Sequence, residues 1–176
     1  MFKIDIHTHI LPENLNDVTG KFTDSRFLKI DPVDDTSAML KKDGKSFRKV
    51  DCNCWNHQAR INDCDDTKVN MQVLSTLPVL FSYWAQDDEC LALSQFLNNH
   101  IAHICRQEPQ RFIGLGTIPM QNTDMAISEM ERCVNELKFP GIEIGSNING
   151  KNLSIEKIQP IFEHAEKIEC SIFVHP

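Results

Sequence analysis

The sequence predicts an α/β fold built on a parallel β-sheet. Short apolar segments alternate along the chain with amphipathic segments of roughly 10–20 residues, and this alternation is typical of βαβ units. Histidines also stand near the ends of the first and the last apolar segments, at residues 7, 9 and 175. In a parallel barrel the C-terminal strand ends meet on one face, which carries the chemistry. The expected fold is therefore a (β/α)8 barrel that is incomplete in this chain.

The first predicted strand covers residues 2–9, where apolar and polar residues alternate. Residues 10–54 are more polar, and we expect them to form a small inserted subdomain above the main body, as a β-hairpin or a three-stranded patch. Extended segments are expected at Phe27–Ile30 and Ser46–Val50. A turn is expected at residues 42–45, because Asp43-Gly44 is a common hairpin sequence.

The rest of the chain is more regular. Later strands are expected at residues 71–77, 112–118, 141–145 and 171–174, and helices at residues 56–66, 87–106, 123–137 and 154–168. Ser154 is a plausible N-cap for the last helix. Five strands cannot close a barrel that needs eight strands and about 250 residues. The interpretation is that residues 1–176 form the N-terminal part of a longer barrel domain.

Composition excludes several classes of protein. Hydrophobic residues make up 41% of the 176 residues and charged residues 24%, as in globular domains with a substantial core. No apolar run approaches the roughly 18 residues that span a membrane, and no secretory signal precedes the first strand, so we expect a cytosolic protein. The net charge of −7 is spread along the chain. No nucleic-acid or membrane partner is therefore expected.

The cysteines and the other histidines favour structural roles. Seven cysteines without a secretory signal indicate reduced thiols. Cys52, Cys54 and Cys64 could suggest a second metal site, but their spacing differs from that of a zinc knuckle and no second pair follows. We expect His57, His100, His103 and His164 to lie on helices or at their starts, with His100 and His103 on a helix surface.

His7 and His9 are the strongest candidates for a functional site. Residues i and i+2 of a strand point to the same face, so these two side chains project together. Zinc is bound by neutral imidazole nitrogens, and two of them on a rigid strand make half of a site. His175 follows the last predicted strand and could supply a third ligand. Asp5 shares the same face and is either a partner of a ligand histidine or a structural residue. The alternative is a pair of structural histidines on a half-exposed edge.

These residues also stand within motifs that resemble a known family. The motifs occur in the same order over essentially the whole chain and correspond to about the first half of the family's enzymes. The chain resembles the 2-amino-3-carboxymuconate-6-semialdehyde decarboxylases of the amidohydrolase superfamily. The segments that carry the resemblance are His7–Pro12, Asp43–Arg48, Asn53–Trp55, Leu74–Pro78, Phe81–Trp84, Arg111–Met120 and Phe173–Pro176.

The resemblance implies a distorted barrel with one catalytic zinc ion, a TIM-barrel fold of the amidohydrolase type. His7, His9 and His175 match three of the family's zinc ligands. The family's aspartate ligand and its catalytic histidine would lie beyond Pro176, so no catalytic residue is expected within this chain. Arg48 matches an arginine that binds a substrate carboxylate, and Phe47 matches a residue of the substrate pocket. A planar guanidinium suits the arginine's role, because it binds carboxylates bidentately.

The resemblance further implies zinc-dependent decarboxylation of 2-amino-3-carboxymuconate 6-semialdehyde in tryptophan and kynurenine catabolism, which limits quinolinate and NAD synthesis. It implies a small-molecule substrate and a homodimer for the full-length form. This 176-residue chain by itself is expected to be inactive. Two alternatives remain: a related decarboxylase of an aromatic acid, and an inactive truncated isoform that acts at most as a binding partner.

Overall fold

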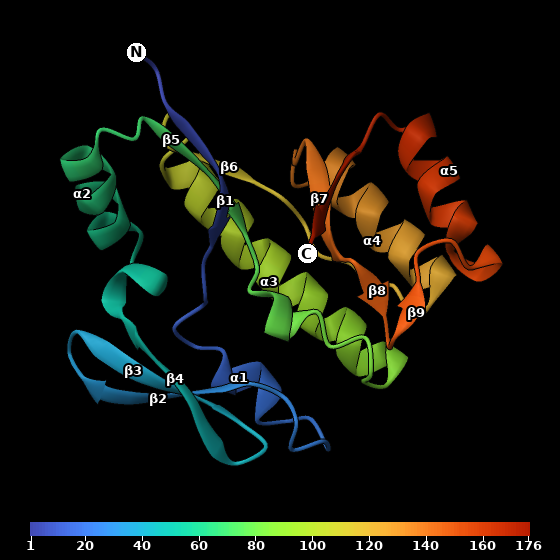
Figure 1. Cartoon of the computed structure of the whole chain (residues 1–176), viewed down its shortest axis with the longest axis horizontal. Helices are drawn as coiled ribbons and strands as arrows, with labels where there is room; N and C mark the ends of the chain where they lie inside the picture. Colours follow the sequence, from blue (N-terminus) through green and yellow to red (C-terminus); the bar gives the residue numbers. More distant parts are fainter.

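The computed structural model describes all 176 residues and contains the predicted parallel strands (Figure 1). Each of the first four strands is followed by a crossover that returns the chain to the same end of the sheet. The α/β fold class is confirmed. The five strands of the barrel are β1 (Ile4–His9), β5 (Met71–Ser75), β6 (Phe112–Gly114), β7 (Gly141–Gly145) and β10 (Ser171–His175).

The five strands lie side by side in the order of the chain. Strands β1, β5 and β6 pair in parallel, and so do β7 and β10. A bridge at Gly116 joins these two parts: its N–H donates to Gly141 O at 3.0 Å, and its carbonyl accepts from Glu143 N at 2.7 Å. A Cβ atom at residue 116 would lie 2.5 Å from Cys133 Sγ. Glycine is therefore required for the close approach at this junction.

The predicted helices are present, with one corrected start. Pro160 lies in the first turn of α5, where its missing N–H costs nothing, and an earlier start would place it inside the helix. Ser154 is therefore not the N-cap, and a 3₁₀ turn (η3, Glu156–Ile158) precedes the helix instead. The helices are α1 (Asn16–Thr19), α2 (His57–Thr67), α3 (Asp87–Gln107), α4 (Thr123–Asn135) and α5 (Gln159–Lys167).

The polar segment after β1 contains a separate three-stranded antiparallel sheet, formed by β2 (Lys29–Asp34), β3 (Ser37–Lys42) and β4 (Lys45–Asp51) (Figure 1). Asp43 and Gly44 both have positive φ, as expected for the two-residue turn between β3 and β4. A second hairpin, with β8 (Asn147–Ile148) and β9 (Lys151–Asn152), was not predicted. The remaining 3₁₀ turns are η1 (Cys52–Cys54) and η2 (Pro78–Leu80).

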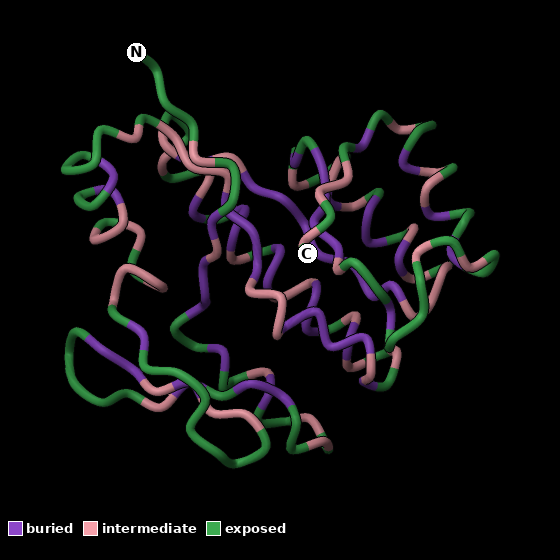
Figure 2. The backbone as a smooth tube through the Cα atoms, in the orientation of Figure 1, coloured by how far each residue is buried: buried purple, intermediate pink, exposed green.

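Helix α3 packs against both the small sheet and the barrel strands (Figure 2). Leu93 and Leu97 belong to a cluster with Phe27, Leu40 and other residues of the polar segment. One helical turn later, Ile101 and Ile104 pack in another cluster with Leu74 and Phe112 of the barrel strands. A third cluster joins β7 to α4 and α5. The small sheet is thereby fixed to the barrel through one continuous helix.

Apolar side chains are exposed along both outer strands of the five-stranded sheet. The exposed fraction is 49% for Ile4 and 60% for Ile6 on β1, and 45% for Val174 on β10. These values are high for strand residues of a barrel, where helices normally cover the outer face. No helix of the structure is long and apolar enough to cross a lipid bilayer.

A buried polar network holds the segment that links β6 to β7. Asn98 on α3 is fully buried; its side chain donates to Thr117 O and accepts from Thr117 N, each at 2.8 Å. The same amide donates to Glu129 Oε1 at 2.6 Å, and Arg132 binds both oxygens of Glu129. The N–H and the carbonyl of Thr117 thus have hydrogen-bond partners in the Asn98 side chain, although no neighbouring strand pairs with this residue.

We predict that Asn98→Ala destabilises the protein by about 2–4 kcal/mol, because it leaves the buried Thr117 N–H and carbonyl without partners. Urea unfolding would measure the change. Gln107→Ala is the matched control, since Gln107 is exposed at the end of the same helix, lies outside the network, and its loss should cost less than about 0.5 kcal/mol. Equal stability of the two variants would show that the network does not support the junction.

Candidate metal centre

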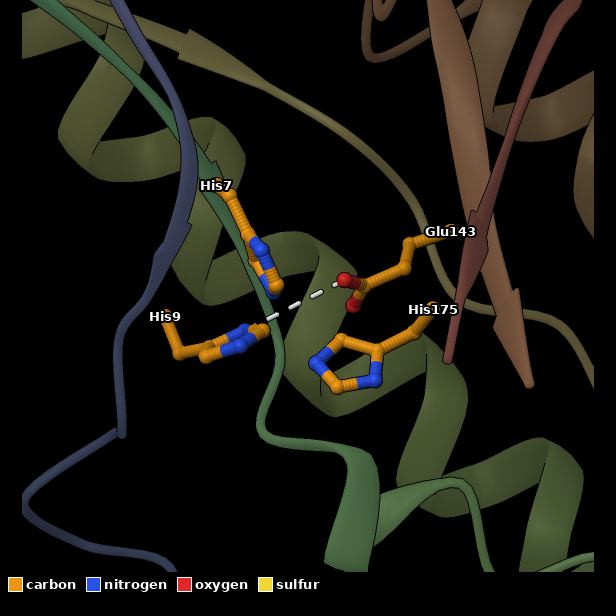
Figure 3. A group of neighbouring side chains, drawn as sticks. All are labelled: His7, His9, Glu143 and His175. Atoms are coloured by element: carbon orange, nitrogen blue, oxygen red, sulfur yellow. Dashed lines mark ion pairs between the residues drawn. The ribbon is translucent and has the colours of Figure 1, made fainter. Parts of the chain in front are cut away.

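The structure brings His7, His9 and His175 together at one point (Figure 3). His7 and His9 project from β1, and His175 projects from the last residue of β10. These are the two outer strands of the sheet, so its curvature brings their C-terminal ends face to face across the barrel interior. The prediction that the three side chains converge is confirmed, while their role as metal ligands stays a prediction.

The three imidazole rings are close enough to share one ion. Their centroids are 5.1 Å apart for His7 and His9, 4.7 Å for His7 and His175, and 5.3 Å for His9 and His175. One nitrogen of each ring and one oxygen of Glu143 all lie within 4.8 Å of one another. This is the only such group of metal-binding side chains in the chain, and Cys52, Cys54 and Cys64 do not form another.

Glu143 is the member of this group that the sequence analysis missed. It is 1% exposed and lies 4.0 Å from His9, measured from Oε1 to Nδ1. Its neighbours on β7, Ile142 and Ile144, pack into the apolar core with α4 and α5. Strand side chains alternate between faces, so Glu143 points into the barrel. The sequence contained an indication of this position, because a single carboxylate stands between two isoleucines in a short predicted strand.

Burial shifts the pKa values of two members of the group in opposite directions. Removal from water lowers the pKa of His9 to about 4, and the nearby His175 and His7 add to the effect. Burial raises the pKa of Glu143 to about 7. The Ser75 hydroxyl opposes this rise, but it donates its hydrogen bond to Thr8 O at 3.0 Å. His9 is therefore neutral at physiological pH, as metal ligation requires.

Hydrogen bonds hold the end of β1 in place. The guanidinium of Arg60 on α2 donates to His9 O at 2.6 Å and to Asn53 O at 3.1 Å. The ring of His9 shares a 3.0 Å hydrogen bond with the Ser75 hydroxyl. Asp5 contacts no histidine ring; it accepts from His7 N and from the Gln72 side chain, each at 3.4 Å. Arg60 and Ser75, rather than Asp5, therefore orient this part of the site.

The chemistry of the donor atoms fits a divalent metal ion. Three imidazoles and one carboxylate are typical zinc ligands, and they also suit manganese. Both oxygens of Glu143 are buried without a hydrogen-bond partner. An unpaired carboxylate beside three imidazoles is electrostatically incomplete, and a cation between them would complete it.

Arg48 and Phe47 lie apart from the histidines, on the exposed part of β4. Arg48 makes no hydrogen bond or ion pair with another side chain, and Phe47 is 55% exposed. A cavity of about 340 Å³ adjoins the metal centre and includes His175 and Lys42 in its wall, but it is lined by neither predicted substrate residue. Their role in substrate binding stays a prediction.

His100 differs from the sequence interpretation. It was expected on a helix surface, yet it is half-buried, its Nε2 has no hydrogen-bond partner, and burial lowers its pKa to about 4. The reason is tertiary: the chain after β1 passes over this face of α3, so the backbone of Leu11 lies close to the ring. His103, one turn further, is exposed as expected.

Comparisons with known proteins agree with this geometry. The family model described as "Amidohydrolase" matches residues 4–176. The chain is 47% identical over 174 residues to 2-amino-3-carboxymuconate-6-semialdehyde decarboxylase of Dictyostelium discoideum. This alignment covers 99% of this chain and 48% of the relative. The protein of the same name from Caenorhabditis elegans is 33% identical, with 96% of this chain and 47% of the relative covered. The resemblance found in the motifs is confirmed.

More distant relatives share the fold. Gamma-resorcylate decarboxylase of Rhizobium radiobacter is 23% identical over 137 residues, covering 68% of this chain and 41% of the relative. The structure of a 5-carboxyvanillate decarboxylase from Novosphingobium aromaticivorans, with bound manganese, superimposes with a TM-score of 0.77 at 22% identity and covers 99% of this chain and 51% of that one. The chain spans about half the length of the curated relatives it matches.

We predict that zinc stabilises the protein and that a chelator reverses the effect. At a zinc concentration about 1,000-fold above Kd, the free energy of unfolding should rise by up to about 4 kcal/mol. His7→Ala should remove most of this gain, and the exposed His103→Ala should keep it. Thermal unfolding with and without zinc measures both variants, and equal zinc responses would contradict the assignment of the centre.

Proposed function

The chain belongs to the amidohydrolase family, and from this premise we propose that the protein is a zinc-dependent decarboxylase of 2-amino-3-carboxymuconate 6-semialdehyde. The observation that carries the proposal is the convergence of His7, His9 and His175 at the C-terminal strand ends of a barrel. The 47% identity to a relative that bears this enzyme's name supports the choice of substrate. The reaction would belong to tryptophan and kynurenine catabolism in the cytosol.

The chain's own residues would hold the metal and orient the substrate. A bound zinc ion acts as a Lewis acid and lowers the pKa of a bound water towards 7. His9, kept neutral by burial, offers a ligand nitrogen without first losing a proton. The Ser75 hydroxyl fixes the direction of its ring, and Arg60 holds its backbone carbonyl. The carboxylates of a substrate would then approach from the adjoining cavity, where Lys42 supplies a positive charge.

Arg48 is the residue we propose for binding a substrate carboxylate, with Phe47 beside it as part of the pocket wall. The Arg48 guanidinium has no intramolecular partner, so its five N–H donors are free for a ligand. It stands on β4, in the sheet that packs against α3. Arg48 would reach the substrate by movement of the exposed β4 end, or from the β4 strand of a second subunit.

The remaining parts of the active site are proposed to come from residues matching the other half of the relatives. The resemblance assigns an aspartate ligand and a catalytic histidine to that half, and a homodimer to the complete enzyme. The exposed apolar residues of β1 and β10 lie where further barrel strands and helices would cover them. Residues 1–176 alone would then bind metal without turning over substrate.

A second candidate function is decarboxylation of an aromatic acid. The gamma-resorcylate decarboxylases among the relatives favour it, although at 23% identity over a shorter part of the chain. The two functions share the metal centre and differ in the shape of the pocket. Parallel assays with aminocarboxymuconate semialdehyde and with gamma-resorcylate would decide between them.

We predict that a chimera of residues 1–176 and the second half of the Dictyostelium discoideum relative decarboxylates aminocarboxymuconate semialdehyde. Arg48→Ala in the chimera should lower kcat/KM by about 10- to 100-fold, the value of one or two charge-assisted hydrogen bonds. Substrate absorbance and carbon dioxide release give the rates. The matched control is Lys49→Ala, an exposed cation on the same strand, which should change the rate less than about twofold.

Two results would contradict these expectations. Full activity of the Arg48→Ala chimera would exclude the proposed role of Arg48. Steady turnover by residues 1–176 alone would show that the catalytic residues lie within this chain. A chimera active only on gamma-resorcylate would support the second candidate function.

A further inference from the structure

Glu143 has a setting that the proposed function does not explain. It is as buried as any charged residue of the chain, and neither carboxylate oxygen has a hydrogen-bond partner. We propose that Glu143 is a direct ligand of the metal ion, so that residues 1–176 supply a carboxylate ligand as well as three histidines. This inference rests on the metal centre of the proposed function and goes beyond it, because the resemblance assigned the carboxylate ligand to an aspartate after Pro176.

A second buried glutamate shows what a structural carboxylate looks like in this fold. Glu129 is also 1% exposed, but Arg132 binds it through two hydrogen bonds of 2.7 and 2.8 Å, and Asn98 adds a third of 2.6 Å. Buried ionised carboxylates need such partners, because desolvation costs several kcal/mol per ion. Glu143 has no arginine or lysine partner, and the His9 ring, 4.0 Å away, is neutral at physiological pH. A metal ion would supply the missing partner.

The position of Glu143 follows from the sheet register. On β10, Phe173 pairs with Glu143 and His175 pairs with Gly145, so His175 lies two residues further along than the glutamate. The long side chain of Glu143 spans this offset and reaches the level of the imidazoles, as Figure 3 shows. The histidines of β1 approach from the opposite side. The four donors therefore surround one point instead of lining one edge.

The spacing of the four donors suits one ion after small rotations. Ligand atoms 2.0–2.2 Å from a tetrahedral zinc ion lie about 3.3–3.6 Å apart. One ligand atom from each of the four side chains lies within 4.8 Å of the others. The carboxylate has no competing hydrogen bond to break when it moves inward. Each ligand atom would move toward the ion by about 1 Å or less when the ion binds.

The proposal predicts that Glu143→Gln weakens zinc binding by the full chain more than about 100-fold, since loss of a residue that only supports a ligand costs 10- to 100-fold. Competition with a chromophoric zinc chelator measures the affinity. The glutamine is isosteric and removes only the charge. Glu163→Gln, which changes the same charge on the exposed side of α5, is the matched control and should bind zinc like the wild type.

Cobalt(II) gives a second measurement that does not depend on activity. Its visible spectrum reports the ligand set, so Glu143→Gln should change band positions and intensity, whereas Glu163→Gln should not. Metal-free thermal unfolding provides the folding control. Without metal, Glu143→Gln should be at least as stable as the wild type, because the unpaired carboxylate is gone. With zinc, the wild type should be the more stable of the two, because it binds the ion more tightly.

Three results would overturn the inference. Zinc affinity of Glu143→Gln within about threefold of the wild type, with an unchanged cobalt spectrum, would place the carboxylate outside the ligand set while leaving the three-histidine centre intact. No zinc binding by the wild type would overturn the metal centre and the proposed function with it. Should the variant fail to fold, a crystal structure of the zinc-loaded wild-type chain with Glu143 beyond about 3 Å from the ion would have the same meaning.

Discussion

The backbone bridge at Gly116 is the interaction on which the rest of the structure depends. It joins the part of the sheet that carries His7 and His9 to the part that carries Glu143 and His175, through hydrogen bonds of 3.0 and 2.7 Å. Without this bridge the two halves of the candidate metal centre would stand on separate sheets. The junction leaves no room for a side chain at residue 116, and the Asn98 amide satisfies the next residue's backbone. Sheet geometry, rather than any contact among the histidines, sets their convergence.

The two buried glutamates, Glu129 and Glu143, differ in whether their carboxylates have partners. Glu129 is neutralised by Arg132 and Asn98 within the helices that cover the sheet, and this network is structural. Glu143 lies on the opposite side of the same sheet with no partner, and burial raises the pKa of its carboxyl group to about 7. Perturbed titratable groups that lack a structural partner are typical of functional sites. The contrast identifies the barrel interior as the functional side of the sheet.

The small antiparallel sheet extends the site beyond the barrel. Helix α3 fixes it to the barrel core, and its β3 end places Lys42 in the wall of the cavity beside His175. A substrate with carboxylate groups would therefore meet the proposed metal ion on one side and Lys42 on the other. Phe47 and Arg48 stand further out on β4, where they are free to contact a ligand or a neighbouring subunit. The candidate metal ligands on the barrel strands and the positive charge of Lys42 on the small sheet fit the decarboxylase function proposed above.

Local sequence pattern was sufficient for the elements that periodicity defines. The alternation of apolar strands with amphipathic helices predicted the five barrel strands, and Asp43-Gly44 predicted the β3–β4 turn. It also identified His7 and His9 as a pair, because their i, i+2 relation is a local property of a strand. Three features present in the sequence were missed: Glu143 between two isoleucines, Pro160, which fixes the start of α5, and Asn149-Gly150, which forms the turn of the β8–β9 hairpin.

The sequence by itself determined the order and type of the main elements and the histidines that compose the site. Only the tertiary structure decided that His175 meets His7 and His9, that Glu143 joins them, and that His100 is half-buried. Those outcomes depend on pairing between strands and on packing between segments distant in the chain. Alternation within one strand indicates which side chains share a face, but which residues of two strands lie opposite each other, and how far the strand ends curve together, depend on contacts between distant segments.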